Sequence, residues 1–521
     1  MTPLPNLEAK IVIVGCGISG IGAALKLIKN GFKNVRIIEA TGRSGGRIRT
    51  GRLGSNIVEI GANWIHGPSQ GNPVFRLACQ HGLLDPADTT EENQAMDVGG
   101  HPPWVPTFLR SSGGEVEPET LAPALEVFSQ VMETVQGFSS SGGGEPVASV
   151  GEFIRTELPR LAKDDWMAQG EGLWNLRMSF VNTMLKGECC INGTPTMEDL
   201  SLRACGLYQT LPGLDCTFPR GYEGLVDCLM RQLPEGTVAY NTPVCKVHWA
   251  DGKHTGTHPH TLSQAHTHPV QVECASGEVF PADHVIVTVP LGYLKKHHTT
   301  LLSPPLPGHK AQSVERMGFG TNNKIFLEFA QPFWSPTTEV IYLLWEDEEH
   351  LRDTVPNIHT HWARKLFGFT VLKPTERYGH VLCGWIAGHE SEYMESLPEA
   401  EVLNTVTQVL RRFTGIPSLS VCRMLRSQWF SEVYTCGSYS YPATGCSAVD
   451  IAHLAEPLPP AHTHTQPLQV LFAGEATHDS YFSTVHGALM SGWREADRLI
   501  AHHSSASASS SSSSSQLSSK L

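Results

Sequence analysis

The stretch that decides the fold is KIVIVGCGISGIGAALKLIKNGFKNVRIIEA, residues 10–40. Its first five residues form a β-branched apolar run, which is typical of a buried strand. Glycines then open a segment with apolar residues at helical spacing, which ends at Gly31 and is followed by a second apolar strand. Strand, turn, helix and strand in this order predict a βαβ unit with a parallel sheet, so the predicted fold class is α/β.

Three glycines in this stretch, Gly15, Gly17 and Gly20, have the spacing G-x-G-x-x-G. Directly after a strand and at the start of a helix, this spacing is typical of a dinucleotide-binding turn. We expect Gly15 to permit the tight turn, Gly17 to let the backbone approach a pyrophosphate, and Gly20 to allow close packing of helix on strand. Glu39 ends the second strand, where an acidic residue binds the ribose hydroxyls of adenosine and disfavours a 2′-phosphate. The alternative is a tight βαβ corner that binds no ligand.

The length and net charge of the chain limit the kinds of protein that it can be. A chain of 521 residues predicts two domains. Its net charge of -13 is unfavourable for binding nucleic acid and compatible with a cationic ligand. The sequence has no apolar run of membrane-spanning length, no secretory pattern and no disulfide-like spacing of its 13 cysteines. These features predict a soluble protein of a reducing compartment, without nucleic-acid or membrane partners.

A second glycine-rich segment, TGRSGGRIRT, follows Glu39 almost directly. Gly45 and Gly46 allow another stretch of backbone to approach a dinucleotide, and the flanking Arg43 and Arg47 are suited to neutralising phosphate. This pattern resembles the flavin-containing amine oxidases, whose prosthetic group is FAD. The resemblance favours FAD over NAD, and an NAD-dependent dehydrogenase is the alternative.

The resemblance extends over most of the chain, with similar segments at residues 57–67, 218–229, 285–295, 318–329 and 471–499. It implies a Rossmann-like FAD-binding domain of the amine-oxidase and glutathione-reductase type, with an interleaved α+β substrate domain. We expect the FAD-binding domain at residues 5–95, 215–310 and 430–503, and the substrate-binding domain at 96–214 and 311–429. A disordered serine-rich tail is expected at 504–521.

Local patterns predict further features outside these motifs. Residues 85–120 are expected to form loops, residues 139–146 a flexible connection and residues 274–279 a strand. Five histidines between positions 254 and 268 indicate either a metal site or an exposed hairpin insertion. We favour the insertion and expect no metal cofactor.

Finer features distinguish branches of the family. In monoamine oxidases a cysteine just before a tyrosine bonds the flavin covalently, whereas here Ser438 precedes Tyr439 and Cys436 lies two residues before Ser438. We therefore expect FAD to be bound non-covalently. Residues 61–67, 187–194 and 437–445 look most similar to the acetylpolyamine and spermine branches of the animal polyamine oxidases.

The first of these branches implies a specific activity. This is FAD-dependent oxidation of N1-acetylspermine and N1-acetylspermidine at a secondary amine by molecular oxygen. The products would be 3-acetamidopropanal, spermidine or putrescine, and hydrogen peroxide. A spermine oxidase that acts on free spermine and a catalytically inactive flavoprotein are the alternatives.

The resemblance also implies catalytic and substrate-binding residues. Lys324 is expected to be buried, with a lowered pKa, and to hold a water near the flavin. His66 is expected to hydrogen-bond the reacting amine, and Glu188, in a loop at 187–190, to pair with a distal ammonium group. Further substrate contacts are expected from Asn322, Tyr439 and Ser483. The competing interpretations are a surface lysine, a core histidine and a solvated carboxylate.

A larger set of residues is expected to contact the cofactor. Beyond the glycines, arginines and acidic residue named above, these are Gly61, Ala62, Asn63, Trp64, Val244, Trp385, Gly474, Glu475, Thr484 and Val485. Trp385 is expected to form an aromatic wall with Tyr439, and Glu475 to bind the ribityl–phosphate region. The closing helix, which begins near Thr484, is expected to point its N–H groups at the flavin.

The chain ends in Ser519, Lys520 and Leu521, which match the S-K-L peroxisomal address. We therefore expect synthesis in the cytosol, binding to the peroxisomal import receptor and a location in the peroxisomal matrix. An oxidase that releases hydrogen peroxide is suited to that compartment. We further expect the protein to act as a monomer.

Overall fold

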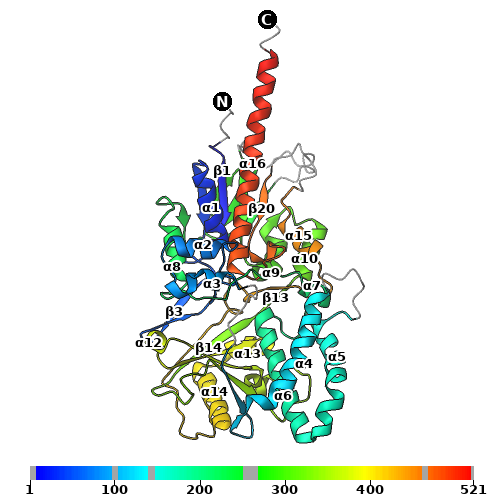
Figure 1. Ribbon diagram of the computed structural model, residues 1–521. Helices are drawn as coiled ribbons and strands as arrows, with labels where there is room; N and C mark the ends of the chain where they lie inside the picture. The colour runs from blue at the N-terminus through cyan, green and yellow to red at the C-terminus, as the bar shows by residue number, and fades with distance from the viewer. Residues whose placement is uncertain (1–6, 97–103, 139–146, 250–267, 460–467, 518–521) are drawn as a thin grey trace.

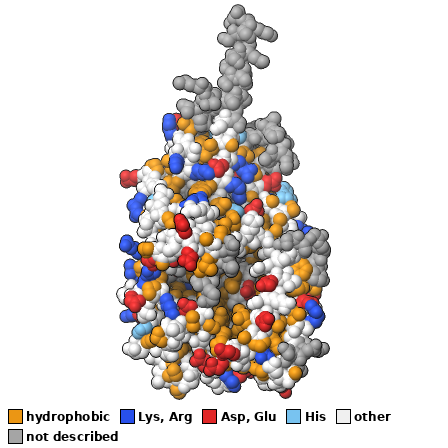
Figure 2. All heavy atoms as spheres, in the orientation of Figure 1, with side chains coloured by type: hydrophobic (Ala, Val, Ile, Leu, Met, Phe, Trp, Pro, Cys, Tyr) orange, Lys and Arg blue, Asp and Glu red, His pale blue; other side chains and the backbone are white. Residues whose placement is uncertain are grey.

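A computed structural model describes residues 7–96, 104–138, 147–249, 268–459 and 468–517. Figure 1 shows two halves, one built around a parallel sheet and the other around a larger mixed sheet. The expected connection at 139–146, four of the five histidines between 254 and 268, and the final tripeptide lie outside the described residues. On the face shown in Figure 2, acidic and basic side chains are interspersed, with hydrophobic side chains between them.

The parallel sheet forms the core of the first half. Its strand order is β20-β11-β1-β2-β7, with bounds Val470–Phe472, His284–Val287, Lys10–Val14, Asn34–Ile38 and Val238–Ala239. Alternate residues of β1 enter two different cores. Ile11 and Ile13 pack with helices α1 (Ile18–Lys29) and α16 (Val485–Leu517), whereas Val12 and Val14 pack on the other face. Because both faces of the parallel sheet are covered, β1 is a continuous run of apolar residues after Lys10.

The second face of this sheet is covered by a smaller sheet of order β10-β9-β8-β12. Its strands are Val279–Ala282, Val270–Cys274, Val244–His248 and Leu302–Ser303. Helices α9 (Leu291–Leu301), α10 (Gly308–Arg316) and α15 (Ala448–Ala455) complete this layer.

The second half contains a seven-stranded sheet of order β18-β14-β17-β16-β15-β5-β6. Its strands are Arg423–Arg426, Asn322–Glu328, Val381–Ala387, Gly368–Val371, Val340–Leu344, Pro106–Arg110 and Glu115–Val116. One face packs on α4 (Pro118–Gly137), α5 (Val150–Trp166) and α6 (Glu171–Asn192), and the other on α13 (His389–Ser396) and α14 (Glu399–Thr414). Phe326 of β14 faces the first group and Ile325 the second, so Lys324, two residues from Phe326, shares the α6 side.

Short elements complete the two halves and the segments between them. They are β3 (Thr50–Leu53), β4 (Asn56–Glu59), α2 (Pro73–Gln80), α7 (Leu202–Cys205), α8 (Glu223–Met230), β13 (Gly318–Gly320), α11 (Ile358–His361), α12 (Thr375–Tyr378), β19 (Tyr439–Tyr441) and four 3₁₀ turns at Pro86–Thr89, Met167–Gln169, Trp362–Lys365 and Glu475–Thr477. The mixed α/β architecture agrees with the predicted fold class, and the domain boundaries stay a prediction.

Three local predictions differ from the structure. Residues 85–120, expected as loops, contain a 3₁₀ turn, helix α3 (Glu91–Gln94), strands β5 and β6 and the start of α4, because β5 joins the large sheet beside β15. Of residues 274–279, expected as a strand, the four at 275–278 form the turn between β9 and β10. Gly277 has a φ of 85°, and Cys274 N–H donates to the Glu278 carbonyl.

The third difference concerns the serine run. Helix α16 continues to Leu517, where a disordered tail was expected. Alanine and serine follow one another there without glycine or proline, so nothing in the sequence stops a helix that is already docked on α1.

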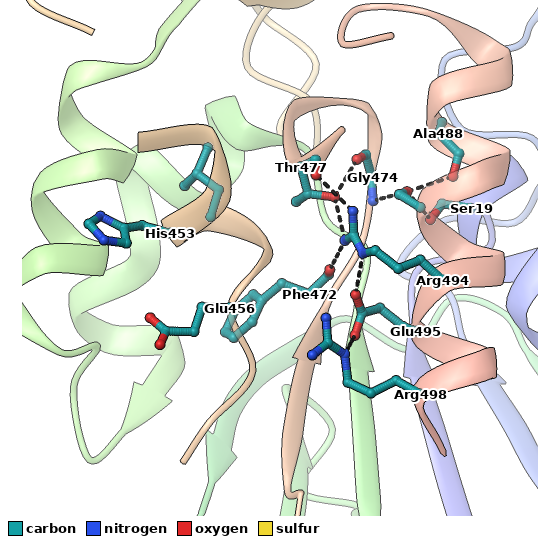
Figure 3. A network of polar contacts seen from close by, with 12 residues as sticks. Ser19, His453, Glu456, Phe472, Gly474, Thr477, Ala488, Arg494, Glu495 and Arg498 are labelled. Carbon is teal, nitrogen blue, oxygen red and sulfur yellow. Dashed lines mark hydrogen bonds and ion pairs between the residues drawn. The ribbon is translucent and has the colours of Figure 1, made fainter. Parts of the chain in front are cut away.

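One polar cluster fixes α16 to the turn that follows β20 (Figure 3). Arg494 donates to the carbonyls of Phe472 and Thr477 and to the Thr477 hydroxyl, at 2.8–3.0 Å. Its Nε also donates to the buried Glu495, whose second oxygen accepts from Arg498. Arg494 therefore holds the turn after β20, and Arg498 does not.

We predict that Arg494→Met destabilises the fold by about 2 kcal/mol more than Arg498→Met, because only the first variant strips hydrogen bonds from the turn. The two arginines are matched, since their side chains are 32% and 33% exposed and both pair with Glu495. Urea denaturation followed by fluorescence measures the difference. Equal losses in the two variants would contradict this role of Arg494.

Candidate active site

A cavity of about 1090 Å³ lies between the two halves. One end is formed where the parallel strands finish, at Gly15, Glu39, Thr288 and Gly474. The other end is formed by residues of the mixed sheet and of helix α6. Ligands of open parallel sheets bind beyond the carboxyl ends of the strands, so the position agrees with a nucleotide site.

The glycine-rich turn has the geometry expected of a phosphate-binding turn. Gly15 has a φ of 109°, which favours glycine, and a Cβ on Gly20 would lie 2.1 Å from the Gly15 carbonyl oxygen. A Cβ on Gly17 would meet nothing within 4 Å, so this backbone faces open cavity. Residues Gly17 and Gly45 form a parallel bridge, which brings the second glycine-rich segment alongside the first.

The charged residues near the turn have protein partners that fix their positions. Glu39 accepts hydrogen bonds from Cys16 N–H and from the backbone and hydroxyl of Thr41. Arg43 donates to the carbonyl of Gly46 at 2.6 Å, so its guanidinium shapes its own loop. Burial lowers the pKa of Arg43.

Glu475 is the centre of a second polar group at the cavity wall. It is buried and pairs with Arg47 at 2.7 Å, and it accepts hydrogen bonds from the Ser440 hydroxyl and from Ser483 N–H. Ser483 has a φ of 68°, and its hydroxyl donates to the Ser440 carbonyl. The proton of that hydroxyl is therefore committed, and a ligand would meet only its lone pairs.

Helix α16 begins directly after this group. The Thr484 hydroxyl caps the helix by accepting from Gly487 N–H at 3.0 Å. Thr484, Val485 and Ala488 line the cavity, so the positive end of the helix macrodipole is directed at it.

Lys324 is 5% exposed and reaches across from β14 to the segment after β4. Its Nζ donates to the carbonyls of Glu59 and Gly61 at 2.7 and 2.6 Å, and it lies 4.9 Å from the centre of the Trp385 ring. Burial lowers the pKa of Lys324 to about 8. The sequence-based expectation of a buried lysine with a lowered pKa agrees with this geometry, and its role in holding a water stays a prediction.

Aromatic side chains surround this lysine. Trp64 and Trp385 stack with their ring centres 5.4 Å apart. The Asn322 amide donates to the Tyr439 hydroxyl at 2.8 Å and to the Cys190 carbonyl at 3.0 Å. Its Oδ1 is buried and has no hydrogen-bond partner within the described residues.

His66 lies at the same end of the cavity. Its Nδ1 is 2.6 Å from an oxygen of Asp215, and the side chains are 42% and 2% exposed respectively. The other Asp215 oxygen accepts from Gly67 N–H. Sequence analysis missed Asp215, because it lies 149 residues from His66 and in no motif.

Glu188 lies in the other arm of the cavity. It is on helix α6 and not in the expected loop, because the helix continues to Asn192 and stops only at Gly193, whose φ is 70°. Its carboxylate accepts from the Asn192 amide, and burial raises its pKa to about 7. Nearby cavity walls are apolar or aromatic, at Phe108, Phe180, Met184, Ile191, Tyr342 and Phe367.

The structure brings all the predicted site residues except Gly20 to this single cavity. Gly20 lies beneath the turn, as its packing role requires. Those that line the cavity are Gly15, Gly17, Glu39, Arg43, Gly45, Gly46, Arg47, Gly61, Ala62, Asn63, Trp64, His66, Glu188, Val244, Asn322, Lys324, Trp385, Tyr439, Gly474, Glu475, Ser483, Thr484 and Val485. Their individual roles stay predictions.

The described residues show neither a metal site nor a membrane-spanning helix. Among those residues, no group of three or more histidine, cysteine or acidic side chains is placed to hold a metal ion. No helix there has both the length and the apolar character needed to cross a bilayer.

Comparisons with known proteins agree with this geometry. The family model for flavin containing amine oxidoreductases matches residues 18–500. A Bos taurus protein named peroxisomal N(1)-acetyl-spermine/spermidine oxidase is 47% identical over 95% of each chain, and a Homo sapiens protein of the same name is 47% identical over 94% of this chain and 95% of its own. Polyamine oxidase 1 of Oryza sativa subsp. japonica is 33% identical over 95% of this chain and 98% of its own.

Solved structures support the same fold. A double mutant of putrescine oxidase superposes with a TM-score of 0.67 and 19% identity, over 95% of this chain and 99% of that one. The open cradle at Gly17, the paired glycine-rich segments and the cavity volume fit the family's cofactor, FAD. The chain therefore belongs to the family of flavin containing amine oxidoreductases, which are FAD-dependent enzymes.

Proposed function

We propose that the protein oxidises N1-acetylated polyamines, N1-acetylspermine and N1-acetylspermidine, at a secondary amine. Oxygen and water are consumed, and 3-acetamidopropanal, spermidine or putrescine, and hydrogen peroxide are released. The two mammalian relatives with 47% identity over nearly the whole chain support this substrate class.

The pairing of carboxylates in the cavity carries the proposal. Its acidic lining residues are Glu39, Glu188, Asp215, Glu432 and Glu475. Glu475 pairs with Arg47, Glu432 with Arg49 and Asp215 with His66, whereas Glu39 holds the glycine-rich turn. Within the described residues, Glu188 has no cationic partner. A carboxylate without a cationic partner among apolar walls suits a substrate with a neutral acetylated end and an ammonium group beyond the reacting amine.

The proposed roles follow from position. Glu188 binds the distal ammonium, and Asn322 with His66 orients the reacting amine. FAD, bound non-covalently because Ser438 and not cysteine precedes Tyr439, supplies the hydride acceptor that oxygen regenerates. Lys324 fixes the segment from Glu59 to Asn63 and presents its ammonium between that segment and the Trp385 ring.

The proposed location is the peroxisomal matrix, reached through an import receptor that binds Ser519, Lys520 and Leu521. The names of the two mammalian relatives support it. We also propose that the enzyme acts as a monomer.

We predict that N1-acetylspermine and N1-acetylspermidine give the highest kcat/KM when hydrogen peroxide release is compared with that from free spermine and spermidine. Faster oxidation of free spermine would replace the proposal with a spermine oxidase. A flavin that no polyamine bleaches without oxygen would indicate an inactive protein. Lys324→Met is the control, expected to keep FAD and to bleach about 100-fold more slowly.

We predict that the affinity for N1-acetylspermine rises as the pH is raised from 6 to 8. The Glu188 carboxyl is neutral below its pKa of about 7 and charged above it, whereas the distal ammonium stays protonated throughout. Glu188→Gln should bind about tenfold more weakly at pH 8 and lose this pH dependence. Anaerobic flavin reduction at several substrate concentrations measures the affinity, with the exposed Glu171→Gln, on the same helix, as matched control. Unchanged affinity in Glu188→Gln would contradict the assignment.

We predict that removal of Leu521 moves a tagged protein from peroxisomes to the cytosol, because the receptor reads the carboxyl-terminal tripeptide. Fluorescence microscopy with a peroxisomal marker measures the change. The tag belongs at the N-terminus, so that the terminal carboxylate stays free. Continued punctate fluorescence after the deletion would remove this support for the location.

A further inference from the structure

The histidine at the reacting end of the cavity is held by an almost fully buried carboxylate. Asp215 is 2% exposed, and one of its oxygens lies 2.6 Å from His66 Nδ1. His66 is 42% exposed, and its Nε2 has no hydrogen-bond partner within the described residues. The ring is therefore fixed at its buried nitrogen and open to the cavity at the other.

Backbone contacts make this arrangement rigid. The residues adjoining the pair, Ile65 and Cys216, form an antiparallel bridge with hydrogen bonds of 2.8 and 3.3 Å. Gly67 N–H donates to the second Asp215 oxygen at 3.1 Å. Both carboxylate oxygens are thus engaged, one by a backbone donor and one by the His66 ring.

The bonds determine which nitrogen of His66 carries the proton. An ionised carboxylate only accepts hydrogen bonds, so His66 Nδ1 must donate and a neutral ring then has its lone pair on Nε2. Two other titratable groups near the pair bring no charge to it. Burial lowers the pKa of His486 to about 3 and raises that of Tyr208, so both are neutral near pH 7.

We propose that Asp215 is a positioning residue, which keeps His66 in the tautomer whose Nε2 accepts a hydrogen bond from the reacting amine. The inference rests on the proposed amine substrate. A secondary amine loses hydride from the neighbouring carbon only when its nitrogen lone pair is free to form the C=N bond. If His66 Nε2 accepts, it takes the N–H of the amine and leaves the nitrogen lone pair free. If Nε2 carried the proton, it would donate to that lone pair and oppose the reaction.

Asp215→Asn tests this directly, because the amide has nearly the same shape and one acceptor fewer. Gly67 N–H can only donate and will hold the amide oxygen, so the amide NH₂ faces His66 Nδ1. Nδ1 must then accept, and the proton moves to Nε2. The variant is expected to reduce its flavin at least tenfold more slowly, with the substrate dissociation constant changed less than about twofold.

The experiment is a double-mutant cycle with FAD-loaded wild type, Asp215→Asn, His66→Gln and the double variant. Anaerobic stopped-flow with N1-acetylspermine gives the limiting reduction rate per bound flavin and the dissociation constant. If Asp215 acts through His66, adding Asp215→Asn to His66→Gln changes the rate by less than about twofold. An equal slowing in both backgrounds, or weaker binding without slower reduction, would overturn the proposal.

Two further measurements distinguish a positioning role of Asp215 from a purely structural one, and a failure of this inference from a failure of the proposed function. Asp215→Glu keeps a group that only accepts, and it is expected to recover part of the lost rate. If both variants merely lose FAD or melt earlier, with normal rates for the flavin that remains, Asp215 is structural and the proposal is wrong. Wild-type reduction by N1-acetylspermine tests the proposed function itself, and the cycle is run with the polyamine that reduces wild type fastest.

Discussion

The site depends on the buried ammonium of Lys324. An unpaired cation at this depth would cost several kcal/mol, and the carbonyls of Glu59 and Gly61 with the face of Trp385 offset that cost. The same contacts join β14 of the mixed sheet to the segment after β4. The positions of Trp64 and His66, which follow on that segment, are therefore set relative to the substrate-binding half.

A second constraint separates charge along the cavity. At the nucleotide end, the N-termini of α1 and α16 supply positive potential, and Arg47 is neutralised by Glu475. Glu188 lies among apolar and aromatic cavity walls, and no described residue places a cation against it. The protein's own charges therefore favour an anionic phosphate at the first end, and the proposed site for a cationic ammonium lies at Glu188.

The parts that the sequence could predict depend on residues close together in the chain. Gly15, Gly17 and Gly20 act within one turn, so their spacing alone indicated their geometry, and the family resemblance extended the prediction to further lining residues. The predictions failed where distant contacts decide the outcome. Strand β5 exists because β15 pairs with it, and Asp215 meets His66 across a sequence separation of 149 residues.

Basic side chains at the reacting end create a problem for an enzyme of cationic substrates, because a fixed positive charge there would repel them. Burial lowers the pKa of His486 to about 3, so that ring carries no charge near pH 7. It also lowers the pKa of Lys324 to about 8, so the Lys324 ammonium loses its proton just above neutral pH. Asp215 places a negative charge behind His66, so a proton on that ring would be balanced within the protein. The proposed binding of the distal ammonium at Glu188 would leave the amine that must be neutral to react beside groups that do not require it to be charged.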